Sequence, residues 1–200
     1  MRKTGLSLMT LLTLMTLVAV VLGPSAQAGA GFQAVAYDSG PGLAAWHANE
    51  GASLTGGNGH AMHLEVPWDE ARQRGRPSVG GEGGAGVDIE GVGGITLSEL
   101  GFDIRNGETC DRWLGPHLVV YTADGSFSFE CATGLRAPSP NDPLNWTRVR
   151  FTDAGARGDP WPGFGNVVVT DIFMYLLDGR VHLDNFDING VLIGGPGSRH

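Results

Sequence analysis

The sequence FMYLLDGRVHLDNFDING, residues 173–190, predicts two β-strands separated by a turn at Asp178-Gly179. An Asp-Gly pair between apolar segments is a strong signal for a tight turn. After the turn, Arg180 to Asp184 alternate polar and apolar residues, which is typical of a strand that buries one face. This segment therefore indicates a β-rich fold, and the rest of the chain can be compared with it.

The second of these strands changes its apolar parity halfway along. Val181 and Leu183 occupy alternate positions, whereas Phe186 and Ile188 occupy the opposite set. Because side chains alternate between the two faces of a strand, both pairs can reach one core only if an extra residue is inserted between them. We therefore expect a β-bulge at Asp184-Asn185. Asp184 would then either hydrogen-bond to nearby backbone or act as a ligand of a structural calcium ion.

Apolar residues alternate with polar ones in four further segments, as expected for half-buried strands. Their apolar positions are Met62, Leu64 and Val66; Leu100, Phe102 and Ile104; Phe127, Phe129 and Cys131; and Thr147, Val149 and Phe151. A helical turn is expected at 68–74, and a Gly-rich loop is expected before a strand at 87–90. About eight to ten strands in one domain, residues 29–200, predict an all-β antiparallel β-sandwich of jelly-roll type.

The N-terminus, residues 1–28, has the pattern of a secretory signal peptide. Arg2 and Lys3 precede an apolar run, Gly23-Pro24 interrupts it, and Ala26-Gln27-Ala28 supplies the small residues of a cleavage site. A membrane anchor is the alternative, because the apolar run approaches spanning length. The cleavage site favours release, so we expect a secreted protein, extracellular or periplasmic, with no membrane association after cleavage.

The charge of the chain argues against several partners. Of 13 basic residues, Arg2 and Lys3 belong to the expected signal peptide, which leaves 11, all Arg, against 21 acidic residues and a formal net charge of −10. An acidic chain without a basic run is not expected to bind nucleic acid or an anionic membrane. Arg- and Gly-rich usage with a single Lys suggests a bacterial genome of high GC content.

The two cysteines, Cys110 and Cys131, are expected to form one disulfide bond. Secreted proteins mature in an oxidising compartment, where a pair of cysteines is usually oxidised. The alternative is a nucleophilic thiol, which the same compartment disfavours.

Several segments together resemble galactose-binding-like jelly-roll domains, the fold of many carbohydrate-binding modules found in secreted bacterial proteins. Residues 145–151, Asn-Trp-Thr-Arg-Val-Arg-Phe, are similar to a W-x-x-V-x-F strand of those modules, and residues 181–188 are similar to their final strand. Residues 63–66 resemble an early strand. The resemblance implies glycan binding. The chain departs from the pattern at Phe32-Gln33, where a Phe-Glu pair often joins a structural calcium site, and this departure argues against such a site. We therefore expect no cofactor, with a structural calcium ion at Asp184 as the alternative.

Trp146, Arg148 and Arg150 are the candidate ligand-binding residues, because alternate positions of one strand share a face. An indole ring beside guanidinium groups could stack on a sugar and hydrogen-bond to its hydroxyl groups. The alternative is that Trp146 packs under a loop. His63 and Glu65 also share a face and could bind a metal, but zinc usually needs a third ligand, which the sequence does not nominate.

No sequence signature identifies a catalytic residue, and the chain has no nucleophile elbow, zinc-protease motif or phosphate-binding loop. We therefore expect a non-catalytic binding protein for an extracellular glycan or a cell-wall polysaccharide. One alternative is a structural or surface-interaction protein without a small ligand. The other is a secreted hydrolase that uses two carboxylates, with Asp38, Glu65, Asp103 and Glu130 as candidates.

Overall fold

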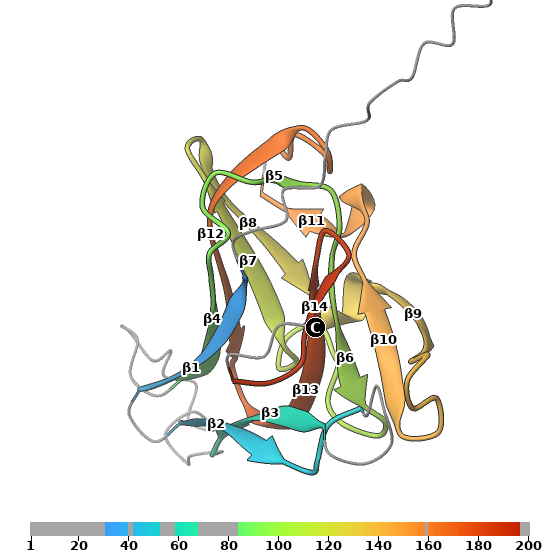
Figure 1. Cartoon of the computed structure of the whole chain (residues 1–200). Coiled ribbons are helices and arrows are strands. Elements are labelled where there is room, and N and C mark those ends of the chain that lie inside the picture. The colour runs from blue at the N-terminus through green and yellow to red at the C-terminus, as the bar shows by residue number, and fades with distance from the viewer. Residues whose placement is uncertain (1–30, 40–41, 53–58, 68–83, 159, 197–200) are drawn as a thin grey trace, which may run out of the picture. The chain divides into compact units, whose positions relative to one another are not determined.

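The computed structural model describes residues 31–39, 42–52, 59–67, 84–158 and 160–196, and Figure 1 shows their course. The described residues all belong to one compact unit, Gly31–His200. The expected signal peptide, the helical turn at 68–74 and most of the Gly-rich loop lie outside the described residues. Within the described part of the chain, no helix has the length and apolar character needed to cross a membrane.

The described strands form two seven-stranded antiparallel sheets. The first sheet has the order β1-β4-β12-β7-β8-β11, with β5 also paired to β12. Its strands are β1 (Gln33–Ser39), β4 (Gly84–Glu90), β5 (Thr96–Leu97), β7 (His117–Thr122), β8 (Gly125–Glu130), β11 (Ala156–Arg157) and β12 (Val167–Leu176).

The second sheet has the order β2-β3-β13-β6-β10-β9, with β14 also paired to β13. Its strands are β2 (Leu43–Ala48), β3 (His60–Val66), β6 (Leu100–Arg105), β9 (Leu135–Pro138), β10 (Trp146–Arg150), β13 (Gly179–Ile188) and β14 (Val191–Ile193). Two short 3-10 turns, η1 (Cys131–Thr133) and η2 (Asp153–Gly155), lie in the connections.

One hydrophobic core lies between the two sheets. Alternate residues of the strands face it, including Leu64 on β3 and Phe102 on β6 from the second sheet, and Val87 on β4 and Met174 on β12 from the first, all completely buried. The expected all-β sandwich is confirmed. Alternation explains it, because each strand can offer one apolar face and the two sheets cover each other.

Residues 173–190 form the two expected strands, but these strands do not pair with each other. β12 belongs to the first sheet and β13 to the second, so that the turn at Asp178-Gly179 carries the chain across the sandwich. Gly179 has a φ of +84°, which favours glycine, and its N–H donates to the Asp178 carboxylate at 2.6 Å.

The bulge at Asp184-Asn185 is confirmed. The pairing of β13 with β6 shifts register between Asp184 and Asp187, and Asn185 adopts a φ of +47°. Asparagine tolerates this left-handed conformation better than most residues. Val181 and Leu183 before the bulge, and Phe186 and Ile188 after it, all join the core.

The disulfide bond between Cys110 and Cys131 is confirmed, with 5.2 Å between the two Cα atoms. It joins the segment that precedes β7 to η1, which follows β8. A bridge across 21 residues stabilises the fold by about 3 kcal/mol on the chain-entropy argument.

Candidate functional site

The outer face of the second sheet carries polar side chains, because the apolar positions of its strands face the core. Asp103 on β6 and Asp184 on β13 project from this face and are nonetheless 0% and 1% exposed. The Ala52 N–H donates to Asp184 at 2.7 Å, and the Ser139 hydroxyl donates to Asp103 at 2.7 Å. The segments that follow β2 and precede β10 therefore lie over the sheet, and we call this surface the covered face.

Asp103 is the centre of a buried hydrogen-bond network on the covered face. Its carboxylate accepts from Arg148 Nε at 2.9 Å, from Arg148 Nη2 at 3.2 Å and from Asn185 Nδ2 at 2.9 Å, in addition to Ser139. The hydrogen bond to Asp103 is the largest cause that raises the pKa of Arg148. This network joins β6, β10 and the bulge of β13. The buried carboxylate of Asp103 thus receives four hydrogen bonds in place of those that water would provide.

Asp184 is held by the backbone. Its two oxygens accept from the Ala52 and Asn185 N–H groups, each at 2.7 Å. Burial raises the pKa of Asp184 to about 7, although these two hydrogen bonds lower it. Calcium takes six to eight oxygen ligands, whereas N–H donors face this carboxylate. The surroundings of Asp184 therefore favour the hydrogen-bonding interpretation, and calcium at this residue stays a prediction.

Trp146 shares a face of β10 with Arg148 and Arg150, as the alternation predicts, but its ring is covered. It is 2% exposed and packs with Ala52 and Ala61 beneath the segment that follows β2. The Arg105 guanidinium lies 5.4 Å from the centroid of the ring. Neither face of the indole is free to stack on a sugar, so a stacking role for Trp146 is not compatible with the fold. The physical reason is the overlying segment, which strand alternation does not reveal.

Arg148 and Arg150 have carboxylate partners within the chain. Arg148 binds Asp103, and Arg150 pairs with Asp187 through Nη2 and with Glu99 through Nε at 3.2 Å. Each arginine side chain is about one-fifth exposed. A ligand would have to compete with these ion pairs for the two arginines. Their contacts within the chain therefore stabilise the covered face.

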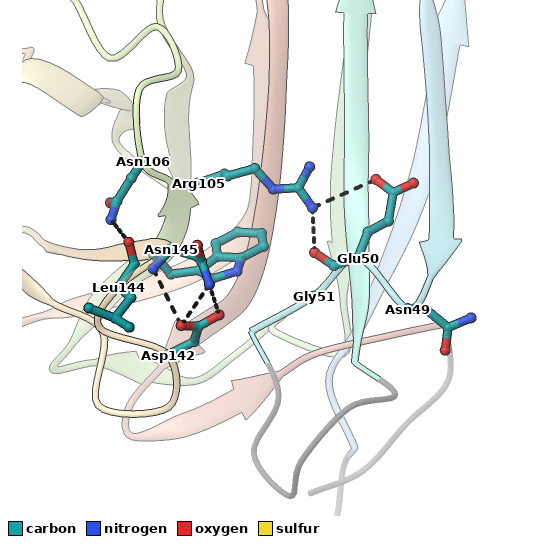
Figure 2. Close-up of a pocket in the computed structure, with 9 residues that line it drawn as sticks. Asn49, Glu50, Gly51, Arg105, Asn106, Asp142, Leu144 and Asn145 are labelled. Atoms are coloured by element: carbon teal, nitrogen blue, oxygen red, sulfur yellow. Dashed lines mark hydrogen bonds and ion pairs between the residues drawn. The ribbon is translucent and has the colours of Figure 1, made fainter.

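A groove of about 580 Å³ opens beside Trp146, between the segment that follows β2, the end of β6 and the turn that precedes β10 (Figure 2). Its lining is mostly polar. The residues that line it are Asn49, Glu50, Gly51, Arg105, Asn106, Asp142, Leu144, Asn145 and Trp146.

Hydrogen bonds organise the walls of the groove. Arg105 Nη2 donates to the backbone carbonyl of Glu50 at 2.7 Å and lies 3.7 Å from its carboxylate. On the opposite wall the Asn145 amide donates to both oxygens of Asp142, at 3.1 and 3.0 Å. Leu144 is 86% exposed beside them. Figure 2 shows Arg105 reaching from β6 toward Glu50.

Three histidines from neighbouring strands meet next to this groove. His47 on β2, His63 on β3 and His182 on β13 place ligand-type nitrogens within 4.8 Å of one another. His63 and His182 are direct cross-strand partners. The sequence analysis paired His63 with Glu65, which do make contact at 3.2 Å, but it nominated no third ligand. No local signal could have identified His182, because 119 residues separate it from His63.

Of the other tryptophans within the described residues, Trp113 is the one that is largely exposed. Trp46 donates its N–H to the Ala34 carbonyl, and Trp161 donates to Asp153 at 2.8 Å while its ring packs on Phe129. Both rings are therefore parts of the packing. Trp113 is 68% exposed.

The four carboxylates considered for hydrolysis do not meet. Asp38 and Glu130 lie on the first sheet, and Glu65 and Asp103 lie on the second. Glu65 pairs with Arg180 and Asp103 pairs with Asp184, so the backbones of Glu65 and Asp103 are two strands and four residues apart. Ordinary strand spacing and rise then give a separation of about 16 Å. Hydrolysing pairs stand about 5 to 9.5 Å apart.

No protein-family model matches this sequence, and no curated protein matches it. Two solved structures are similar in their backbone. One is a family 11 carbohydrate-binding module from Clostridium thermocellum in complex with a β-1,3-1,4-mixed-linked tetrasaccharide, with a TM-score of 0.41 and 14% identity over 85% of this chain and 99% of that chain. The other is the solution structure of CtCBM11, with a TM-score of 0.41 and 13% identity over the same shares. Similarity at this level does not decide a fold or a ligand, so the β-sandwich assignment rests on the strands themselves.

Proposed function

We propose that this protein is a secreted, non-catalytic binding protein that takes a segment of an extracellular glycan or cell-wall polysaccharide into the groove beside Trp146. The observation that supports this most is the lining of that groove. Its volume of about 580 Å³ lies within the range of about 300–1,000 Å³ common to small-ligand sites.

The chemistry of the lining suits a sugar better than the other ligand classes. Sugar hydroxyl groups both donate and accept, and the groove offers carboxylates on Glu50 and Asp142, amides on Asn49 and Asn106, and the guanidinium of Arg105. The net negative charge of the chain disfavours polyanions.

Apolar contact comes from Leu144 and the edge of Trp146. Leu144 is 86% exposed in the free protein, so a sugar ring that covers it would remove apolar surface from water. Such a ring would lie across the polar wall formed by Asp142 and Asn145, which fixes the orientation of its hydroxyl groups.

The test is a polysaccharide and glycan binding screen of the exported protein, followed by affinity measurement for any ligand found. Leu144→Ala should weaken binding about tenfold, equivalent to about 1.4 kcal/mol. Asn49→Gly should also weaken it, and glycine preserves the φ of +65° at this position. Leu135→Ala is the matched control, because Leu135 is 65% exposed on β9 and does not line the groove.

Two results would contradict the proposal. If no glycan in the screen binds, the protein is better explained as a structural or surface-interaction protein. Equal affinity of the wild type and the Leu144 and Asn49 variants, together with loss in Tyr37→Ala on the first sheet, would move the site to the opposite face of the sandwich.

Secretion is part of the same proposal. It is supported by the signal-like N-terminus and by the disulfide bond, which suits an oxidising compartment. N-terminal sequencing of the exported protein is expected to start at Gly29, and retention of residues 1–28 in membranes would instead indicate an anchor.

A further inference from the structure

The cluster of His47, His63 and His182 directs unprotonated ring nitrogens toward one another, and such a cluster of lone pairs is favourable when a cation binds between them. Two of its rings approach closely, with His63 Nδ1 only 3.0 Å from His182 Nε2. The Glu50 carboxylate lies 3.1 Å from the same His182 nitrogen. Which of these atoms carries a proton follows from what the opposite edge of each ring contacts.

Glu108 determines the form of His182. Its carboxylate contacts His182 Nδ1 with one oxygen and the His182 backbone N–H with the other. A carboxylate only accepts hydrogen bonds, so Nδ1 carries the proton that Glu108 receives. The remaining nitrogen, Nε2, then presents a lone pair toward His63 and Glu50.

Glu65 acts on His63 in the same way. Its carboxylate lies 3.2 Å from His63 Nε2 and accepts the proton there, which leaves a lone pair on Nδ1. Two nitrogen lone pairs and the oxygen of Glu50 thus converge on one point, and only a cation makes that arrangement favourable.

His47 supplies the third imidazole. Its ring stacks on His63 with 4.8 Å between the ring centroids, and its Nδ1 lies 3.6 Å from Glu50. The side chain of His47 is 38% exposed. One ligand-type nitrogen of His47 already lies within 4.8 Å of those of His63 and His182.

We propose that His47, His63 and His182, together with Glu50, bind a divalent transition-metal ion of the Zn²⁺ type. Imidazole nitrogens favour zinc and copper over calcium and magnesium, which prefer oxygen. Zinc bound at about 2.0–2.1 Å in a tetrahedral site separates its ligand atoms by about 3.4 Å. The observed separations of 3.0 and 3.1 Å need to widen by only a few tenths of an ångström.

Glu65 and Glu108 have the role of outer carboxylates in this site. Each holds the far nitrogen of a ligating imidazole, an arrangement that orients the ring and raises its basicity. Arg105 lies 3.7 Å from Glu50 and keeps that carboxylate near the histidines. The site goes beyond glycan binding, and metal uptake can be measured without any sugar.

The experiment is titration of Zn²⁺ into the exported, tag-free protein, with the metal content measured after dialysis. We expect one Zn²⁺ per chain. His63→Gln and His182→Gln should each weaken binding at least a hundredfold, and Glu108→Gln should weaken it about 10–100-fold. His47→Gln, at a partly exposed position, tests the third imidazole without risk to the fold.

His60→Gln is the matched control, because His60 lies on β3 with His63 but is not part of the cluster. Co²⁺ provides a spectroscopic probe, and its visible absorption in the wild type should show tetrahedral coordination that His47→Gln changes. Absence of stoichiometric Zn²⁺ uptake would overturn the proposal and assign a shared proton to the cluster. Uptake that all of the cluster variants retain would overturn it as well.

Discussion

The outer faces of the two sheets obey the same strand alternation and yet have opposite chemistry. Across the first sheet a row of rings, Tyr37, Phe173, Tyr175 and His117, runs from β1 through β12 to β7, with neighbouring centroids 6.1, 6.1 and 5.1 Å apart. Tyr37 at one end is 48% exposed. On the covered face of the second sheet, by contrast, the buried carboxylates of Asp103 and Asp184 lie under the connecting segments together with the ring of Trp146.

The difference lies in the connecting segments. Residues 49–52 and 139–145 lie over the second sheet and exclude water from carboxylates such as Asp103, which then require ion pairs and hydrogen bonds. Solvent contact on a β-sandwich is therefore decided by its loops, whereas polarity is decided by the strands. The covered face is where single substitutions should cost most.

The largest effect is expected at Asp103. Asp103→Ala leaves Arg148 without its main partner and the buried donors of Ser139 and Asn185 without an acceptor, and should lower the free energy of unfolding by about 3–5 kcal/mol. Chemical denaturation measures this loss. Asp171→Asn, on the exposed side of β12 in the first sheet, is the control and should cost less than about 1 kcal/mol. Equal losses would remove the distinction between the two faces.

A smaller loss is expected at Gly86, beneath the row of rings. A Cβ at this position would lie 2.6 Å from the Met174 carbonyl and 2.7 Å from the ring of Phe173. Gly86→Ala should therefore destabilise by about 1–3 kcal/mol through overpacking. Gly93→Ala, where the nearest atom is 3.4 Å from the added Cβ, should be nearly neutral, and thermal unfolding of both variants provides the comparison.

The smallest effect concerns the pH dependence contributed by His117, whose Nε2 is buried without a partner. Burial lowers the pKa of His117 below its ordinary value of 6.5, although Glu130 opposes the shift. The unfolded chain binds a proton near pH 6.5 and the folded chain only at lower pH, so stability falls as the pH decreases from 6.5 toward the folded value. Above that window His117 contributes nothing.

The loss is at most about 1.4 kcal/mol for each pH unit. Unfolding free energies at about pH 7.5 and about pH 5.5 should differ less in His117→Gln than in the wild type. If the two free energies differ by the same amount in the variant and in the wild type, the His117 ring is accessible to solvent.

Much of the architecture is readable from local pattern. Period-two alternation identifies the strands, and the parity change between Leu183 and Phe186 locates the bulge, because one core must receive both halves of β13. The cysteines could be paired because only two exist. Each of these inferences depends on residues close in sequence or on a count.

The candidate sites depend on contacts that local pattern does not carry. The alternation placed Trp146 on the outer face of β10, but the segment containing Ala52 covers it. Likewise, the short turn between β12 and β13 is typical of a hairpin whose two strands pair. In the structure the two strands belong to opposite sheets. Loop placement and strand order are properties of the whole chain.

By itself the sequence determined the bulge, the disulfide bond and the strands with clear alternation, although it predicted about eight to ten strands and the described residues form fourteen. Only the tertiary structure decided which strand faces lose water and which side chains meet, as His47, His63 and His182 do. The physical reason is that side-chain alternation is a local property with a period of two residues. The choice of pairing partner and register instead depends on burying apolar faces across the whole domain, and no segment specifies that alone.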